Sequence, residues 1–185
     1  MLKKIFVVGL FISYCSSLLA GSINAQLSND SARFMYVGGI SRLHFEGGVI
    51  YESGGSYLGI VGILVTGENA DAPVVASLGI RAYGGQVSDD TLPSSTVAVL
   101  GLGGDLAFNP VELPGFEFGV HYYIAPNTVS AGDSSKLVDY GLRVGYQVIP
   151  LSTVFIGYQS IAIEIDGYGK YILDDGFIIG MNFTF

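Results

Sequence analysis

The sequence is poor in charge, in cysteine and in long apolar segments. Only 13% of its 185 residues are charged, and Cys15 is the single cysteine. Beyond residue 25 no stretch supplies the roughly 18–20 consecutive apolar residues that a membrane helix needs, which excludes a helical membrane protein. Glycine and proline, at 27 and 6 residues, stay below the roughly 25–30% that marks low-complexity disorder. The length is that of one ordered domain.

Basic side chains are also scarce, with 8 Lys and Arg against 16 Asp and Glu. A net charge of −8 argues against a nucleic-acid partner, because phosphate backbones are bound by clusters of Lys and Arg. It also argues against a basic amphipathic helix on anionic lipid. A single cysteine offers neither a disulfide framework nor a thiolate metal site. We expect no cofactor and no bound metal.

The N-terminus has the pattern of a secretory signal peptide. Two lysines at positions 3–4 form a basic start, and residues 5–20 are uncharged and mostly apolar. Cleavage is expected after Ala25, with Ala20 as the alternative site. An N-terminal membrane anchor is the other interpretation of this segment.

The rest of the sequence alternates at period two between apolar and polar side chains. In residues 137–149 the even positions are apolar or aromatic, whereas the odd positions carry Asp139, Arg143, Gln147 and glycines. Residues 116–125 divide in the same way. Membrane-spanning β-strands of about 9–11 residues have this pattern, with apolar side chains toward lipid.

Eight such strands are predicted, an even number as in bacterial barrels. They are residues 42–52, 56–68, 74–87, 96–108, 116–125, 136–149, 153–165 and 176–185. Turn residues separate them. Short turns are expected in the periplasm at 69–73, 109–115 and 150–152, and longer loops outside at 88–95, 126–135 and 166–175. Residues 32–40 either extend the first strand or form a periplasmic lead segment.

A soluble barrel of the lipocalin kind, or a sandwich, is the rival architecture, with apolar side chains inside and polar ones outside. Its polar face would meet water and carry many charges. Here the polar face is mostly glycine, and the apolar face carries the aromatic residues. We therefore predict an all-β, eight-stranded antiparallel up-and-down transmembrane β-barrel over residues 26–185, after a cleaved signal peptide of residues 1–25.

The last strand ends on an aromatic residue, with Phe177, Phe183 and Phe185 on one face. A terminal Phe on an alternating strand resembles the signal that outer-membrane barrels present to their assembly machinery. Phe185 is thus the predicted assembly signal, and the predicted location is the outer membrane of a Gram-negative bacterium. The expected partners are this machinery, membrane lipid and lipopolysaccharide, and we expect a monomer.

If the polar positions face inward, seven titratable side chains enter the lumen. They are Glu46, Arg81, Asp105, Glu117, His121, Asp139 and Arg143. The interior of a small barrel is narrow, and an unpaired buried charge is costly, so these charges are expected to pair. The expected hubs are Arg81 and Arg143, with Glu46, Asp105 and Asp139 as partners. Such pairs would close the lumen; a narrow conductance pathway is the alternative.

The chain lacks the groupings that catalysis needs. His44 and His121 each lack a serine two residues away, and no Gly-x-Ser-x-Gly motif is present. We expect no enzymatic activity. Acidic residues gather in the predicted outer loops, at Asp89, Asp90, Asp133, Asp166, Asp174 and Asp175. They could hold divalent cations that bridge lipopolysaccharide, although acidic loops are more often simply solvated.

The second half of the sequence resembles a known family. The segments that carry the resemblance are His121–Pro126 followed by Asn127–Ser130, Tyr140-Gly141, Pro150–Ser152, Gly157–Gln159, Asp175–Phe177 and the ending at Phe185. Over residues 116–185 the chain is similar to the YfaZ-like outer-membrane proteins. The resemblance implies an outer-membrane barrel and no established activity. Gln159 departs from it, because a basic residue is expected there after Gly-Tyr.

The predicted function follows from the closed lumen and the acidic loops. We expect an integral outer-membrane barrel with a structural or surface-interaction role. The alternative is a small, porin-like channel for ions or small solutes. A lumen of many glycines beside few bulky groups would favour the channel.

Overall fold

The structure is a computed structural model that describes residues 21–68, 73–89 and 92–185. The strands are β1 (Gly21–Leu27), β2 (Ser31–Ile40), β3 (Leu43–Glu52), β4 (Tyr57–Glu68), β5 (Val74–Asp89), β6 (Leu92–Phe108), β7 (Phe116–Ala125), β8 (Ser130–Gly132), β9 (Ser134–Ile149), β10 (Ser152–Ile165) and β11 (Gly169–Thr184). A short 3-10 helix, η1 (Asn127–Val129), precedes β8. No helix among the described residues is long and apolar enough to cross a membrane. Residues 1–20, which hold most of the predicted signal peptide, lie outside the described residues.

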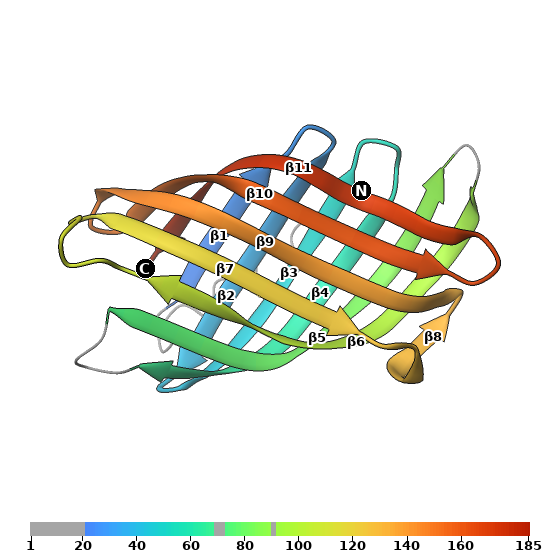
Figure 1. The fold of residues 1–185 in the computed structure, drawn as a ribbon, viewed down its shortest axis with the longest axis horizontal. Coiled ribbons are helices and arrows are strands. Elements are labelled where there is room, and N and C mark those ends of the chain that lie inside the picture. Colours follow the sequence, from blue (N-terminus) through green and yellow to red (C-terminus); the bar gives the residue numbers. More distant parts are fainter. Residues whose placement is uncertain (1–20, 69–72, 90–91) are drawn as a thin grey trace, which may run out of the picture.

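The strands close into an antiparallel up-and-down barrel (Figure 1). Each strand pairs with its neighbours in chain order, except that β7 pairs with β9 and the short β8 attaches to the outside of the circuit at β6. The circuit closes where β1 pairs with β11. At that seam Gly21 and Phe185 exchange two backbone hydrogen bonds of 3.0 and 2.9 Å. The start of β1 and the end of β11 therefore lie side by side at one end of the barrel, which we call the terminus end. The opposite end is called the loop end.

The barrel has ten strands with β8 outside it, so the prediction of eight was wrong. The two additional strands are β1 and β2. The sequence interpretation assigned most of β1 to the signal peptide and left residues 32–40 open between two alternatives. β1 does not show the pattern of a membrane strand by itself, because it is only seven residues long. Its place is set by pairing with β2 and β11.

The prediction of long loops at 88–95 and 166–175 was also wrong. Residues 88–95 are largely the ends of β5 and β6, and residues 169–175 belong to β11. These strand ends were missed because the apolar alternation stops before the strands do. Their outward positions become polar, as at Lys136, Glu164 and Lys170, but the hydrogen-bonded ladder continues. The expected contrast between short turns and long outer loops is therefore weak. Among the connections that the structure describes, 126–133 contains η1 and β8, and 109–115 is a seven-residue connection without a helix or strand.

The predicted alternation is confirmed, with the apolar face outward. On β9, Tyr140 and Leu142 are exposed, whereas Asp139 and Gly141 between them are buried. On β11 the side chain of Phe177 is 78% exposed. A soluble barrel would show the opposite arrangement. An outer surface of this kind is stable against hydrocarbon, so the fold is that of a membrane-spanning barrel.

Aromatic side chains gather on the outer surface at two levels. Near the terminus end, Phe116 packs on Tyr146, with 5.1 Å between ring centroids. Farther toward the loop end, Tyr158 lies between Tyr140 and Phe177, at 6.5 and 6.3 Å. Aromatic girdles of this kind flank the apolar band of transmembrane barrels. The polar outward positions of β9 to β11 lie beyond the second level.

We expect the mature chain to begin at Gly21, because cleavage after Ala20 leaves β1 whole. Cleavage after Ala25 would remove most of β1, and with it the backbone partners of Met181–Thr184 in β11. Unpaired backbone groups in hydrocarbon are costly. Mass spectrometry of the protein purified from membranes measures the new N-terminus. A chain that begins at Gln26 and still gives a heat-dependent gel shift, the sign of a closed barrel, would contradict this prediction.

Candidate functional site

The loop end of the lumen is filled by apolar side chains. One buried cluster, here called the apolar cluster, comprises Met35, Ile50, Leu58, Ile60, Tyr83, Val87, Val97, Val99, Ala125, Leu137, Ile161, Ile163, Ile165 and Leu173. Three of its members, Ile50, Val87 and Ile165, lie within two residues of the loop end of their strands. The inward faces of the strands thus meet as a hydrophobic core at this end.

Arg81 is the centre of an ion-pair network on the terminus side of this cluster. Its Nη2 donates to Glu46 Oε2 at 2.9 Å and to Asp105 Oδ1 at 3.4 Å, and its Nε also donates to Glu46. The guanidinium carbon lies 3.7 Å from the centre of the Tyr123 ring. The Tyr123 hydroxyl in turn donates to Asp105 at 2.5 Å. Two-pronged pairing and ring stacking hold the guanidinium in one orientation.

Asp139 is fully buried and is shared by four side chains from three other strands. Its Oδ2 lies 3.6 Å from Arg33 Nη2 and 3.8 Å from Arg81 Nη1, and its Oδ1 lies 3.0 Å from His121 Nε2. The Tyr83 hydroxyl donates to Oδ2 at 3.0 Å. A carboxylate with no access to water needs partners of this kind, because the charge would otherwise be very costly to bury.

Arg33 is a charged lumenal residue that the sequence interpretation missed. It lies on β2, in the segment that was left without an assignment. Its position along the strand could have indicated this. Arg33 stands between Ala32 and Phe34, both exposed on the outer face, so the alternation of side chains along β2 places Arg33 on the inner face.

A buried amide completes the network at the seam of the barrel. Gln159 Oε1 accepts hydrogen bonds from Gln26 Nε2 at 2.6 Å and from Arg33 Nη1 at 3.1 Å, and its Nε2 donates to Asp174 Oδ2 at 2.7 Å. These four side chains join β1, β2, β10 and β11. Asp174 was expected in an outer loop, and the structure corrects this: it is buried on the inner face of β11. Gln159 takes the place of the expected basic residue by bridging Arg33 to a carboxylate.

Arg143 stands apart from this network, which corrects its prediction as a second hub. Its Nη2 lies 3.0 Å from Glu117 Oε1, and the two side chains are 38% and 30% exposed. Arg143 and Asp139 share one strand, and four residues of strand span roughly 13 Å at about 3.3 Å per residue. Arg143 therefore reaches across to Glu117 on β7 instead.

The lumenal glycines make room for these long side chains. Each arginine of β5 and β9 faces a glycine on both adjoining strands, with Arg81 between Gly62 and Gly101 and Arg143 between Gly119 and Gly157. A Cβ at Gly119 would lie 2.8 Å from Arg143 Nε, and one at Gly62 would overlap the Glu46 carboxylate. These four glycines of the polar face therefore give space to charged side chains.

The remaining polar residues are held in smaller groups. His44 Nδ1 lies 2.9 Å from Thr66 Oγ1, which contacts Ser77 Oγ at 2.8 Å. Within residues 21–68, 73–89 and 92–185, no three His, Cys, Asp or Glu side chains gather closely enough to hold a metal. Asp133 caps the backbone N–H of Thr96 at 2.8 Å. Asp90 lies outside the described residues.

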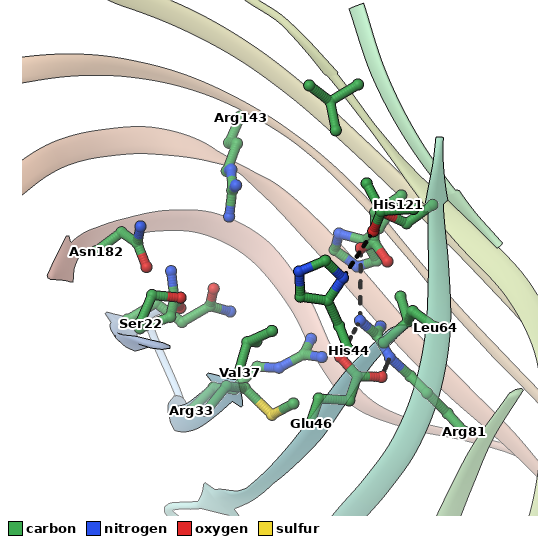
Figure 2. A pocket seen from close by; sticks show the side chains of 17 residues that line it. Ser22, Arg33, Val37, His44, Glu46, Leu64, Arg81, His121, Arg143 and Asn182 are labelled. Atoms are coloured by element: carbon green, nitrogen blue, oxygen red, sulfur yellow. Dashed lines mark hydrogen bonds and ion pairs between the residues drawn. The ribbon is translucent and has the colours of Figure 1, made fainter. Parts of the chain in front are cut away.

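A cavity of about 340 Å³ lies between the ion-pair network and the terminus end. Figure 2 shows side chains from several strands arranged around it, among them Arg143, Asn182, Ser22, His44 and Arg33. The lumen therefore has three levels. An apolar cluster lies at the loop end, the charged network lies in the middle, and a polar cavity lies at the terminus end.

Comparison with known proteins gives one family and several solved barrels. The family described as YfaZ precursor matches residues 6–185. No curated protein matches the sequence.

Three solved structures are similar to this chain. The outer membrane channel DcaP of Acinetobacter baumannii is 10% identical, with a TM-score of 0.47 over 88% of this chain and 54% of that one. The chain thus spans about half the length of DcaP. The KdgM porin is 8% identical, with a TM-score of 0.47 over 90% and 99% of the two chains. The NanC porin is 13% identical, with a TM-score of 0.42 over 90% and 99%.

Replacing Arg81 is expected to cost far more stability than replacing Arg143. Arg81→Gln leaves the buried carboxylates of Glu46 and Asp139 with less compensation, so the free energy of unfolding should fall by roughly 3–5 kcal/mol. Arg143→Gln breaks a half-exposed pair and should cost below about 1 kcal/mol. Urea unfolding followed by circular dichroism measures both. Equal losses would mean that the Arg81 network does not stabilise the barrel.

A methyl group added at Gly62 should also destabilise the barrel. Gly62→Ala places its Cβ against Glu46, which cannot move without leaving Arg81, and overpacking of this kind costs about 1–3 kcal/mol. Gly84→Ala is the matched control, because a Cβ there meets nothing within 4 Å. The control should change the unfolding free energy by no more than about 0.5 kcal/mol. The same unfolding titration tests the pair, and a Gly62→Ala barrel as stable as the control would refute the steric argument.

Proposed function

The chain belongs to the YfaZ family, and from this premise we propose that it is a closed, non-conducting structural barrel of the outer membrane of a Gram-negative bacterium. Its outward face supports the membrane location, since the exposed apolar band and its aromatic side chains match what lipid requires of a barrel. Its role is structural and at the cell surface. The barrel is a rigid cylinder in the membrane, and its loop end faces the outside of the cell. We propose no enzymatic activity.

The observation that carries the closed lumen is the apolar cluster. Leu58, Ile161 and Ile163 are completely buried inside the barrel, although an aqueous pore would expose its lining to water. The Arg81 network adds a second barrier, because its charges bind one another and leave few free groups for a passing ion. Closure thus rests on two adjacent levels, an apolar one and an ionic one.

The terminus end is assigned to the periplasm and the loop end to the outside. Barrels of this class carry their longer loops on the outer side. The terminus end holds the two-residue turns 41–42 and 150–151 and the seven-residue connection 109–115, so the proposed orientation rests on the connection 126–133, which contains η1 and β8 at the opposite end. The elaborate connection 126–133 then lies at the outer surface, where it is the proposed site of surface contacts. Lipopolysaccharide and membrane lipid surround the outer wall of a monomeric barrel.

Phe185 is the proposed signal for the assembly machinery. Its ring is half exposed and lies 6.4 Å from the ring of Tyr36, so it stays available on the outer face of the closing seam. Phe177, Ile179, Met181 and Phe183 line the same outer face of β11.

The protein refolded into a planar bilayer is expected to be electrically silent. The apolar cluster gives ions no hydrated path, so no discrete conductance steps should appear with potassium chloride. A heat-dependent gel shift of the same sample shows that the barrel has formed, and an open porin in the same bilayer is the positive control. Reproducible steps from a folded sample would overturn the closed lumen and establish the alternative, a small channel.

A further inference from the structure

The polar cavity is a compartment closed at one side. The apolar cluster and the Arg81 network close it toward the loop end, whereas Ser22 and Val75, which line it, are each the second residue of their strands at the terminus end. A small molecule could therefore enter only from the terminus end. A volume of about 340 Å³ is within the range of small-ligand pockets.

Two buried hydrogen-bond donors at the cavity have no partner within the described structure. They are Asn24 Nδ2 and Arg81 Nη1, and both residues line the cavity. Arg81 is 5% exposed, and its Nη1 lies 3.8 Å from the nearest Asp139 oxygen, too far for a hydrogen bond. Buried donors are almost always satisfied, so each calls for an acceptor. Arg81 Nη1 faces Asp139, which does not line the cavity, so the amide of Asn24 is the buried donor that a ligand in the cavity would satisfy.

The charges at the cavity wall favour an anion. Three arginines line the cavity, Arg33, Arg81 and Arg143, against the two carboxylates of Glu46 and Asp105. Both carboxylates already accept from Arg81. The partners of the other two arginines, Asp139 and Glu117, are not part of the wall. The surface that a ligand would meet is therefore richer in cationic donors than in free acceptors.

We propose that this cavity binds a small organic carboxylate that enters from the terminus end. Its oxygens accept from Asn24 and from Arg143, whose half-exposed guanidinium points into the same space (Figure 2). Charge-assisted hydrogen bonds to a carboxylate are the strong ones in proteins, and a planar guanidinium suits that geometry. The site does not depend on whether the barrel conducts.

Three sugar derivatives of equal carbon number test the ligand class. Gluconate, glucose and glucosamine are an anion, a neutral molecule and a cation of similar size. Isothermal titration calorimetry uses the protein expressed from the full-length sequence and purified from membranes in detergent. Gluconate should bind at millimolar concentration or below, and at least about tenfold more tightly than glucose or glucosamine, which corresponds to one charge-assisted hydrogen bond.

Two variants locate the site, and one matched variant controls for net charge. Arg143→Gln removes the half-exposed cation, and Asn24→Asp replaces the free amide donor by a carboxylate of the same shape. Each should weaken gluconate binding by about tenfold or more. Arg42→Gln makes the same chemical change as Arg143→Gln, at an exposed turn that does not line the cavity, and should leave gluconate binding unchanged. A heat-dependent gel shift shows that each variant is folded.

The outcomes separate cleanly. Selective gluconate binding that both lumenal variants weaken and Arg42→Gln does not would support the site. Absence of gluconate binding, equal affinity for glucose, or binding that is insensitive to both lumenal variants would overturn it. Should one lumenal variant fail to fold, the other decides. Conductance by a barrel that binds gluconate would overturn the closed lumen of the proposed function and leave the carboxylate site standing.

Discussion

Every backbone N–H and C=O group in the hydrocarbon region must find a partner within the protein, and this requirement governs the rest of the structure. A sheet meets it only by closing. Here the closing contact is the seam between β1 and β11, where Gly21 and Phe185 exchange backbone hydrogen bonds. The seven residues of β1 are thus as important to the fold as strands twice as long. Gln26, Arg33, Gln159 and Asp174 bind one another across the seam and its neighbours.

Closure with ten strands leaves an interior that side chains must fill, and two kinds of filling share the space. Branched apolar side chains pack the loop end as in the core of a soluble protein. In the middle, charged groups are tolerated because each has an opposite charge or an amide beside it. Glycines opposite Arg81 and Arg143 supply the volume that these long side chains need. Part of the high glycine content thus serves to accommodate charged side chains.

The polar cavity is what remains when the inward side chains toward the terminus end are short. Ser22, Asn24, Thr66 and Ser77 take the positions that valine, leucine and isoleucine occupy at the loop end. The lumen is therefore asymmetric along its axis. This asymmetry is what separates the closed barrel we propose from a channel, and it also provides the one space in the described structure where we propose a ligand.

The sequence by itself determined the class of fold, because period-two alternation with an apolar aromatic face admits little besides a membrane barrel. It also determined which residues point inward, since parity along a strand follows from the pleat alone: Glu46, Arg81 and Asp139 all lie in the lumen. The number of strands and the pairing of charges were decided only by the tertiary structure. Both depend on contacts between segments distant in sequence. β1 is a strand because β2 and β11 flank it, and Arg143 binds Glu117 because register places that carboxylate, and not Asp139, within its reach.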